Sequence, residues 1–398
     1  MAIFLLLHVF LLTQLKFTLW PEMMVYPYLV NKGFLLFKDI VNPYPPLLTL
    51  FLALIFKVFG YEAVVGKITA WIFIIATDIA VFYFAKIIYK KLTLALVSLF
   101  FWVILSVYLE VNGLWFEQVS IPFLILGVLF LDRAFKLKNN SRLVISGIFF
   151  AIPLAIKQTA FWLFIPAVFL IFLKTQKIEN VIRFLAPSVF IYLMFLIYAY
   201  SLGIQKEFVD WVFVIPLFVM GRTEGFVQTP TAGQIIRILP IILLAIPAIF
   251  SKNKQIKFVL IFFLFSLFYG VVRFELFHLL PSLAFLVLTI PASLMVVRKR
   301  SLAFMGWFFV FGLLLGLVVK FTAVDWHKET RFFEPSMLDQ SRQISQRASG
   351  QKVYIQNGPD QILAIANLTP IKPWAIQFPW YLENGDLQAR TIESIKKE

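Results

Sequence analysis

Long apolar stretches separated by short polar loops fill the first 320 residues of the chain. A bilayer core about 30 Å thick is crossed by roughly 20 helical residues, each of which rises about 1.5 Å. The pattern therefore predicts an all-α polytopic membrane protein with about eleven transmembrane helices. The expected spans are 2–20, 68–85, 92–109, 119–135, 143–156, 160–173, 184–203, 235–250, 258–272, 278–296 and 302–320.

Charged residues in the loops predict the orientation. One set of alternate loops holds sixteen Lys and Arg with two acids, and the other set holds eight bases with nine acids. Cytoplasmic loops are enriched in Lys and Arg, so the basic set is predicted to be cytoplasmic. This places the N-terminus inside and the C-terminus outside the cell membrane. The basic loops are 86–91, 132–142, 174–183, 252–257 and 298–300.

The apolar stretch 45–60 is predicted to lie along the outer interface rather than to cross. A crossing here would place Lys86, Lys90 and Lys91 outside and reverse every later loop. The stretch belongs to a first outer loop at 21–67. Span 2–20 is predicted to be an uncleaved anchor, because no small-x-small cleavage site precedes Trp20.

The composition changes near Thr322, which divides a transmembrane domain at 1–321 from a polar segment at 325–398. Residues 352–356 suit a strand, a helix is expected from Asp360 through Asn367, and 386–397 reads as an amphipathic helix. These elements predict a small α/β extracytoplasmic domain. Because no strand follows the last helix, this domain is expected to be either very small or incomplete. No internal sequence repeat is apparent.

Overall composition excludes several classes of protein. The chain is 61% hydrophobic, with 47 Phe and only 14% charged residues, unlike a soluble globular protein. Its formal charge of +15 is concentrated in short loops, so the charge predicts orientation and not nucleic-acid binding. The lack of cysteine excludes disulfides and thiolate metal sites, and three His disfavour a His-based one.

Reactive side chains gather on the predicted outer face. Carboxylates at a membrane edge are costly and are therefore functional candidates. A carboxylate beside a bound hydroxyl is the usual general base, while Lys and Arg hold phosphate leaving groups. An aromatic-rich face suits a prenyl tail. The combination predicts sugar transfer from a lipid-phosphate donor. The candidates are Glu22, Asp39, Glu110, Glu117, Lys157, Gln158, Arg273 and His278.

The first outer loop resembles that of the integral-membrane GT-C glycosyltransferases, such as protein O-mannosyltransferases and lipid A or polysaccharide transferases. The Glu117 loop, the Lys157-Gln158 turn and the run 273–278 are similar to further positions of that superfamily. Many relatives carry an acidic pair where this chain has Pro21-Glu22. The residues that carry the resemblance in the first loop are Glu22, Gly33, Phe37-Lys38-Asp39, Pro45-Pro46-Leu47 and Lys57-Val58-Phe59-Gly60.

The resemblance implies an inverting transfer from a polyprenyl-phosphate sugar to a hydroxyl of a lipid, glycan or protein. It implies Glu22 as the base, with Asp39 orienting the loop, the acceptor or a cation; the reverse assignment stays open. Lys157 and Arg273 would stabilise the departing phosphate. A divalent cation held by the outer carboxylates is compatible with the pattern but not required.

Purely structural roles are the alternatives. Glu22 would cap a helix that begins near Pro21, Asp39 would stabilise a turn, and Lys157 would snorkel to the interface. Asp78 lies in mid-span and is expected to form an interhelical hydrogen bond. The remaining alternatives are that Glu110 and Glu117 are solvated and that His278 is a packed histidine.

Two other functions compete with glycosyl transfer. A secondary transporter or lipid flippase would carry charges near the midplane and repeat symmetry, whereas Asp78 is the main mid-depth charge here. The second competitor is a polysaccharide polymerase or ligase that uses a different donor.

Overall fold

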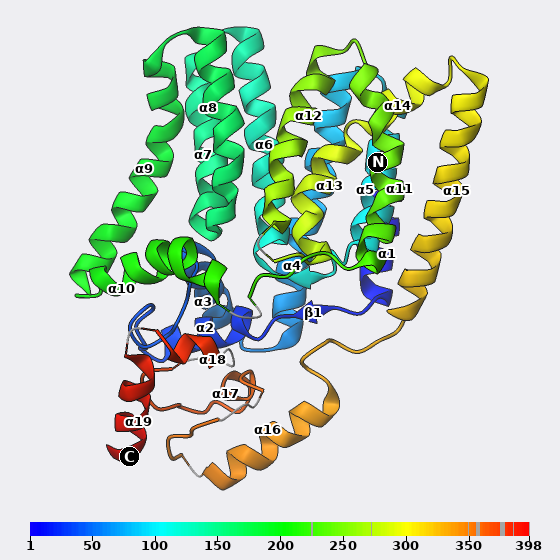
Figure 1. The fold of residues 1–398 in the computed structure, drawn as a ribbon. Helices are drawn as coiled ribbons and strands as arrows, with labels where there is room; N and C mark the ends of the chain where they lie inside the picture. Colours follow the sequence, from blue (N-terminus) through cyan, green and yellow to red (C-terminus); the bar gives the residue numbers. More distant parts are fainter. Residues whose placement is uncertain are drawn as a thin grey trace.

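The computed structural model describes residues 1–223, 226–271, 273–348, 350–355, 359–374, 379–384 and 386–397. These residues form a bundle of upright helices with a layer of shorter elements at one end (Figure 1). The bundle helices are α1 Ala2–Gln14, α4 Ala63–Tyr89, α5 Leu92–Tyr108, α6 Phe116–Leu137, α7 Asn140–Ile156, α8 Phe161–Thr175, α9 Ile178–Ser201, α11 Ala232–Ala245, α12 Lys254–Ser266, α13 Leu280–Val287, α14 Ile290–Val297 and α15 Ser301–Val324.

A multi-pass membrane protein is confirmed by these helices. Within the described part of the chain, six helices are long and apolar enough to cross a membrane, and a pair bent by 50° at residues 288–289 makes seven. Each of the eleven expected spans overlaps a helix or, at 278–296, the bent pair α13 and α14, but α1, α5 and α7 have only 13, 17 and 17 residues. The count of eleven crossings therefore stays a prediction.

Local sequence explains where the bundle helices end and how they approach one another. Helices α4, α6 and α8 are followed directly by Lys90, Lys138 and Gln176, which adopt left-handed backbone angles that end the helical hydrogen bonding. In α7, a Cβ on Gly147 would overlap the backbone oxygen of Phe184. Only glycine allows α7 and α9 to pack this closely.

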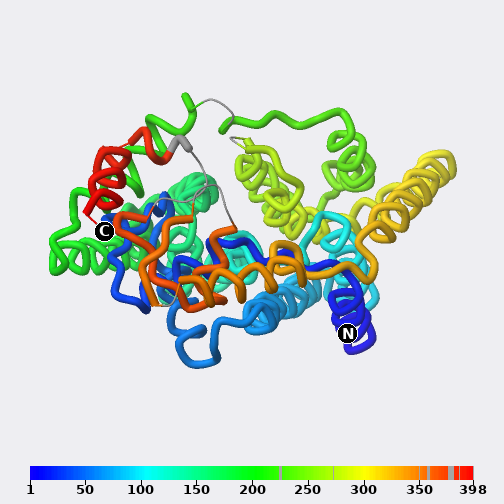
Figure 2. The backbone as a smooth tube through the Cα atoms, turned by 90° about the horizontal axis from the view of Figure 1, so that it is seen from below, coloured from blue at the N-terminus to red at the C-terminus, as the bar shows by residue number. Residues whose placement is uncertain are grey.

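The layer at one end of the bundle, named the loop end, contains most of the predicted outer elements (Figure 1). Helices α2 and α3 pack together there, and Figure 2 shows the C-terminal segment lying across the N-terminal one. The elements of the loop end are β1 Thr18–Leu19, α2 Glu22–Asn31, α3 Leu47–Phe59, β2 Gly113–Leu114, α10 Gln205–Val209, α16 Pro335–Ala348, α17 Ile362–Ile365, α18 Pro379–Leu382 and α19 Leu387–Lys397.

The expected α/β character of the C-terminal segment is not confirmed. Its described residues form helices α16 to α19, and the bridge within the segment pairs Val353 with Pro370, while Trp326, Arg331 and Trp374 pair with residues of the N-terminal part. The strand expected at 352–356 reaches residue 356, which lies outside the described residues. The helix expected from Asp360 forms only at Ile362–Ile365, whereas the amphipathic helix near the end is confirmed as α19. Helix α17 packs against α2, and the hydroxyl of Tyr28 in α2 donates to the backbone oxygen of Leu368.

The first expected span is also shorter than predicted. Helix α1 ends at Gln14, and the chain continues extended through Thr18 and Leu19, which pair in parallel with Gly113 and Leu114. The apolar character of this strand made it look like helix, because both bury nonpolar side chains. This pairing directs the chain into the first outer loop.

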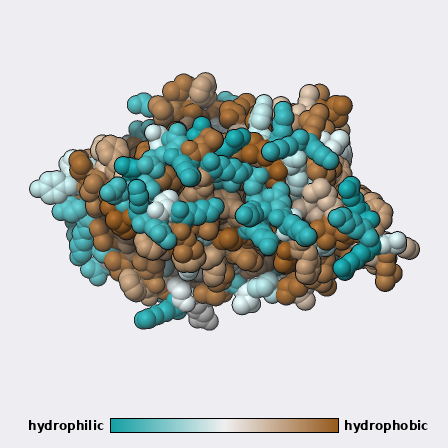
Figure 3. Space-filling view, turned by 90° about the horizontal axis from the view of Figure 1, so that it is seen from above, coloured by the Kyte–Doolittle hydropathy of each residue, from teal (hydrophilic) through white to brown (hydrophobic). Residues whose placement is uncertain are grey.

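Labelling of single cysteines is expected to verify the orientation. Cysteines at Lys90 and Lys138 should react only from the cytoplasmic side, and one at Lys57 only from outside, because the positive-inside rule places them there. All three positions are exposed, and the chain has no other cysteine. Figure 3, which views the bundle from the end opposite the loop end, shows many hydrophilic side chains. Labelling of position 57 from the cytoplasm would reverse the assigned orientation.

Candidate active site

Two similar turns lie side by side at the loop end. Strand β1 pairs in parallel with β2, so that Thr18 lies opposite Gly113 and Leu19 opposite Leu114. Both strands continue as Leu-Trp-x-Glu, at 19–22 and at 114–117, and both then start a helix. The register therefore places Glu22 at the start of α2 and Glu117 at the start of α6 in corresponding positions. The sequence analysis missed this four-residue repeat, although it is readable from the chain.

A buried ion-pair cluster surrounds Glu117, whose side chain is fully buried. Its Oε1 accepts a hydrogen bond of 2.5 Å from Lys157 Nζ and lies 2.7 Å from Nδ1 of His278. The three residues come from α6, from the end of α7 and from the 3₁₀ turn Leu276–Leu279. Glu117 is therefore not a solvated loop end, and Lys157 does not snorkel, because only 8% of it is exposed.

Glu22 is buried but carries no such partner. Only 8% of the residue is exposed, and its Oε2 has no hydrogen bond within the described residues. Burial raises the pKa of Glu22 to about 7, against the opposing effects of its own backbone N–H and the charge of Arg273. A carboxyl group that titrates near neutral pH and has one oxygen without a hydrogen-bond partner is suited to exchange a proton with a bound hydroxyl.

Aromatic rings line the space around the two acids. Trp20 packs against Trp115 with ring centroids 5.0 Å apart, and Tyr44 lies 4.1 Å from the ring of Phe116. The ammonium of Lys157 lies about 6 Å from the ring of Tyr44. Burial raises the pKa of Tyr44 above its ordinary value, and the charges of Glu117 and Glu22 add to the rise. Tyr44, which the sequence analysis missed, thus lies within electrostatic reach of both acids.

Arg273 supplies positive charge near Glu22. Burial raises the pKa of Glu22 and of Glu275, and the charge of Arg273 opposes the rise at both carboxyl groups. No side chain of the described residues forms an ion pair with Arg273. Its backbone is held by a bridge to Gln228. An arginine without a fixed partner is available for an anionic ligand.

Three further candidates have partners outside the cluster formed by Glu117, Lys157 and His278. Asp39 accepts a hydrogen bond from the backbone of Leu35 at 2.9 Å and lies 3.3 Å from Lys372, so it closes a turn and ties the loop to the C-terminal segment. Glu110 is exposed and lies 3.5 Å from Arg237. Gln158 donates to the backbone oxygens of Pro43 and Val212, at 2.7 and 2.8 Å.

Four buried polar atoms in or next to the two turns lack a hydrogen bond within the described residues. Buried side-chain atoms lacking hydrogen bonds are rare and require an explanation. A bound substrate with hydroxyl groups would supply the missing partners. Within the described residues, no group of three His, Asp or Glu side chains could hold a metal ion. Those in or next to the two turns are Glu22 Oε2, Trp115 Nε1, Glu117 Oε2 and Gln118 Oε1, and others lie elsewhere in the described chain.

Comparison with known proteins supports the resemblance found in the sequence. Residues 43–200 match the family model described as dolichyl-phosphate-mannose-protein mannosyltransferase. No curated protein matches the chain significantly. The match indicates a membrane glycosyltransferase of the mannosyltransferase type. It includes Glu110, Glu117, Lys157 and Gln158, whereas Glu22, Asp39, Arg273 and His278 lie outside it.

Proposed function

We propose that this membrane glycosyltransferase of the mannosyltransferase type moves a sugar from a polyprenyl-phosphate donor to a hydroxyl group on the outer face of the membrane. The acceptor belongs to a lipid, a glycan or a protein. The observation that carries the proposal is the buried, unpartnered carboxyl of Glu22 beside the Glu117, Lys157 and His278 cluster.

Glu22 acts as the general base in this proposal. Its Oε2 accepts the hydrogen bond of the acceptor hydroxyl, and the carboxylate takes the proton while the oxygen attacks the anomeric carbon. The phosphate leaves from the opposite face of the sugar, so the configuration inverts. Asp39 keeps a positioning role, because its contacts with Leu35 and Lys372 hold the loop that follows α2.

The departing phosphate is stabilised by cations. Arg273 has no fixed carboxylate partner among the described residues and offers a planar pair of donors that matches phosphate oxygens. Lys157 has three N–H donors, of which the contact with Glu117 uses one. Glu117 therefore orients Lys157, and two N–H donors of the ammonium group remain for the ligand.

Donor binding tests this assignment. Arg273→Met and Lys157→Met are each expected to weaken binding of a polyprenyl-phosphate sugar about tenfold to a hundredfold, since a charge-assisted contact contributes about 1.5–3 kcal/mol. Titration of the purified variants with donor measures the change, and Arg298→Met, at the opposite end of the bundle, is the matched control. Unchanged binding in both site variants would leave the phosphate site without support.

The described structure does not favour a transporter. The charge at mid-depth in the bundle, Asp78, is bound by His8 and Trp102 and is not left free for a transported ion. The unsatisfied carboxyl groups lie at the loop end instead. A polymerase that uses another lipid-linked donor differs from the proposal only in the donor, and the donor titration separates the two.

A further inference from the structure

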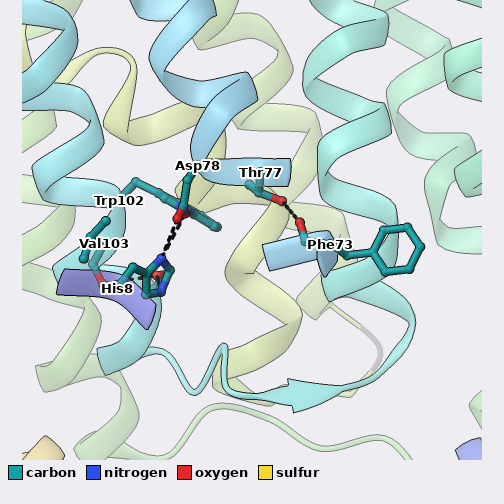
Figure 4. Close-up of polar contacts among 7 residues, drawn as sticks. His8, Phe73, Thr77, Asp78, Trp102 and Val103 are labelled. Carbon is teal, nitrogen blue, oxygen red and sulfur yellow. Dashed lines mark hydrogen bonds and ion pairs between the residues drawn. The ribbon is translucent and has the colours of Figure 1, made fainter. Parts of the chain in front are cut away.

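A polar cluster buried among α1, α4 and α5 plays no part in the proposed chemistry. Nδ1 of His8 lies 2.9 and 3.0 Å from the two carboxylate oxygens of Asp78, and the indole of Trp102 donates to Asp78 Oδ1 at 2.7 Å. Figure 4 shows the carboxylate between these two partners. His8, Asp78 and Trp102 are all fully buried.

Helix α1 depends on this contact more than its neighbours do. Among its 13 residues only His8 and Leu12 are buried, while Ile3, Leu6 and Phe10 are 78%, 69% and 52% exposed. In a bilayer, exposed apolar side chains gain nothing by leaving lipid for a neighbouring helix, so polar contacts and close packing determine helix positions. The His8 contact therefore holds α1 at one height against α4 and α5.

A second contact holds the other end of α1. The side-chain amide of Asn112 donates to the backbone oxygens of Leu12 and Leu15, at 3.0 and 2.9 Å, and its Oδ1 accepts from Trp71 of α4 at 3.0 Å. The last carbonyl groups of a helix have no partners within it, so Asn112 satisfies groups that would otherwise be buried unpaired. Asn112 directly precedes β2, which pairs with β1.

We infer that the buried contacts of His8 with Asp78 and of Asn112 with the end of α1 form a clamp that sets the height of Glu22 relative to Glu117. Glu22 follows α1 through β1, and Glu117 follows α5 through β2, so a shift of α1 along α5 shifts one acid past the other. The clamp residues are positioning residues. This inference rests on the proposed function for its catalytic consequence, but its structural part does not.

The main test combines His8→Leu with Asp78→Asn in the full-length protein. The double variant leaves no buried charge and keeps an acceptor for Trp102, so folding should survive. Because misplacement of about 1 Å can cost on the order of a hundredfold in rate, kcat per folded molecule should fall about tenfold to a hundredfold with donor KM nearly unchanged. His8→Asn, which retains a donor at the position of Nδ1, should recover most of the rate.

Thr77→Val is the matched control. Thr77 is adjacent to Asp78 and buried, but its hydroxyl bonds only to Phe73 within α4, as Figure 4 shows. If the polar cluster stabilises the fold and does nothing more, the double variant and Thr77→Val will have the same kcat per folded molecule. That result would overturn the inference.

A distance measurement separates the clamp from the proposed chemistry. The chain lacks cysteine, so spin labels can be placed at the exposed positions Lys32, at the end of α2, and Glu110, after α5. The double variant should broaden or shift the distance distribution, and Thr77→Val should not. Unchanged distances would overturn the clamp, whatever the rate. A changed distance in a protein that transfers no sugar would support the clamp and contradict the proposed function.

Discussion

Glu22→Gln is expected to lower the rate of sugar transfer by about 10²–10⁴-fold, which is the usual contribution of a general base. Glutamine keeps the shape of the side chain and removes a carboxyl group that burial disfavours in its charged form. The melting temperature should therefore stay the same or rise. Transfer by the purified variant, measured per folded molecule, checks the prediction.

Asp39→Asn is the comparison for Glu22→Gln. It removes the ion pair with Lys372 but leaves an oxygen that can accept from Leu35, so the expected loss is much smaller. A large loss in Asp39→Asn with little in Glu22→Gln would make Asp39 the base. Near-normal transfer in both variants would pass the role to Glu110 or Glu117.

The pH profile gives an independent signature of Glu22. A base must be deprotonated, and burial raises the pKa of this carboxyl to about 7. The rate of the native protein should therefore rise about tenfold per pH unit below 7 and level off above it. The residual rate of Glu22→Gln should lack this step. A native profile that is flat between pH 5 and 8 would contradict the assignment.

Glu117→Leu is expected to have the largest effect on stability. It leaves the buried ammonium of Lys157 without its counter-charge, and breaking a buried pair in this way costs about 3–5 kcal/mol. Thermal denaturation in detergent measures the loss. The double variant Glu117→Leu with Lys157→Met removes both charges and should recover most of the melting temperature. A double variant as unstable as the single one would show that the ion pair is not the cause.

The helical bundle was predictable from the sequence because a membrane imposes a simple pattern. Apolar stretches such as 68–85 and 302–320 must form helices in lipid, since their backbone groups find no water there. The end of α1 was not predictable in the same way. Leu15 and Leu19 are as apolar as the helix before them, and only pairing with β2 and capping by Asn112 reveal that the helix stops at Gln14.

The candidate site was predictable in its residue types and only partly in its contacts. Glu117, Lys157 and His278 were all candidates, but the cluster joins positions 40 and 161 residues apart, and no local pattern reports such pairing. The two Leu-Trp-x-Glu turns were visible in the sequence. A four-residue repeat does not indicate that two segments are neighbours, however, and only the pairing of the strands shows it. Asp39 accepts a hydrogen bond that closes a turn, which the sequence analysis gave as the alternative to a role in the chemistry.

Transfer from a panel of radiolabelled polyprenyl-phosphate sugars, by the purified full-length protein and by Glu22→Gln side by side, tests the central claim most directly. The account predicts that the native protein transfers at least one of these sugars to a hydroxyl acceptor with inversion of the anomeric centre, and that the variant, which still binds the donor, does so about 10²–10⁴-fold more slowly. Equal transfer by the two proteins, or no transfer from any polyprenyl-phosphate sugar, would contradict it.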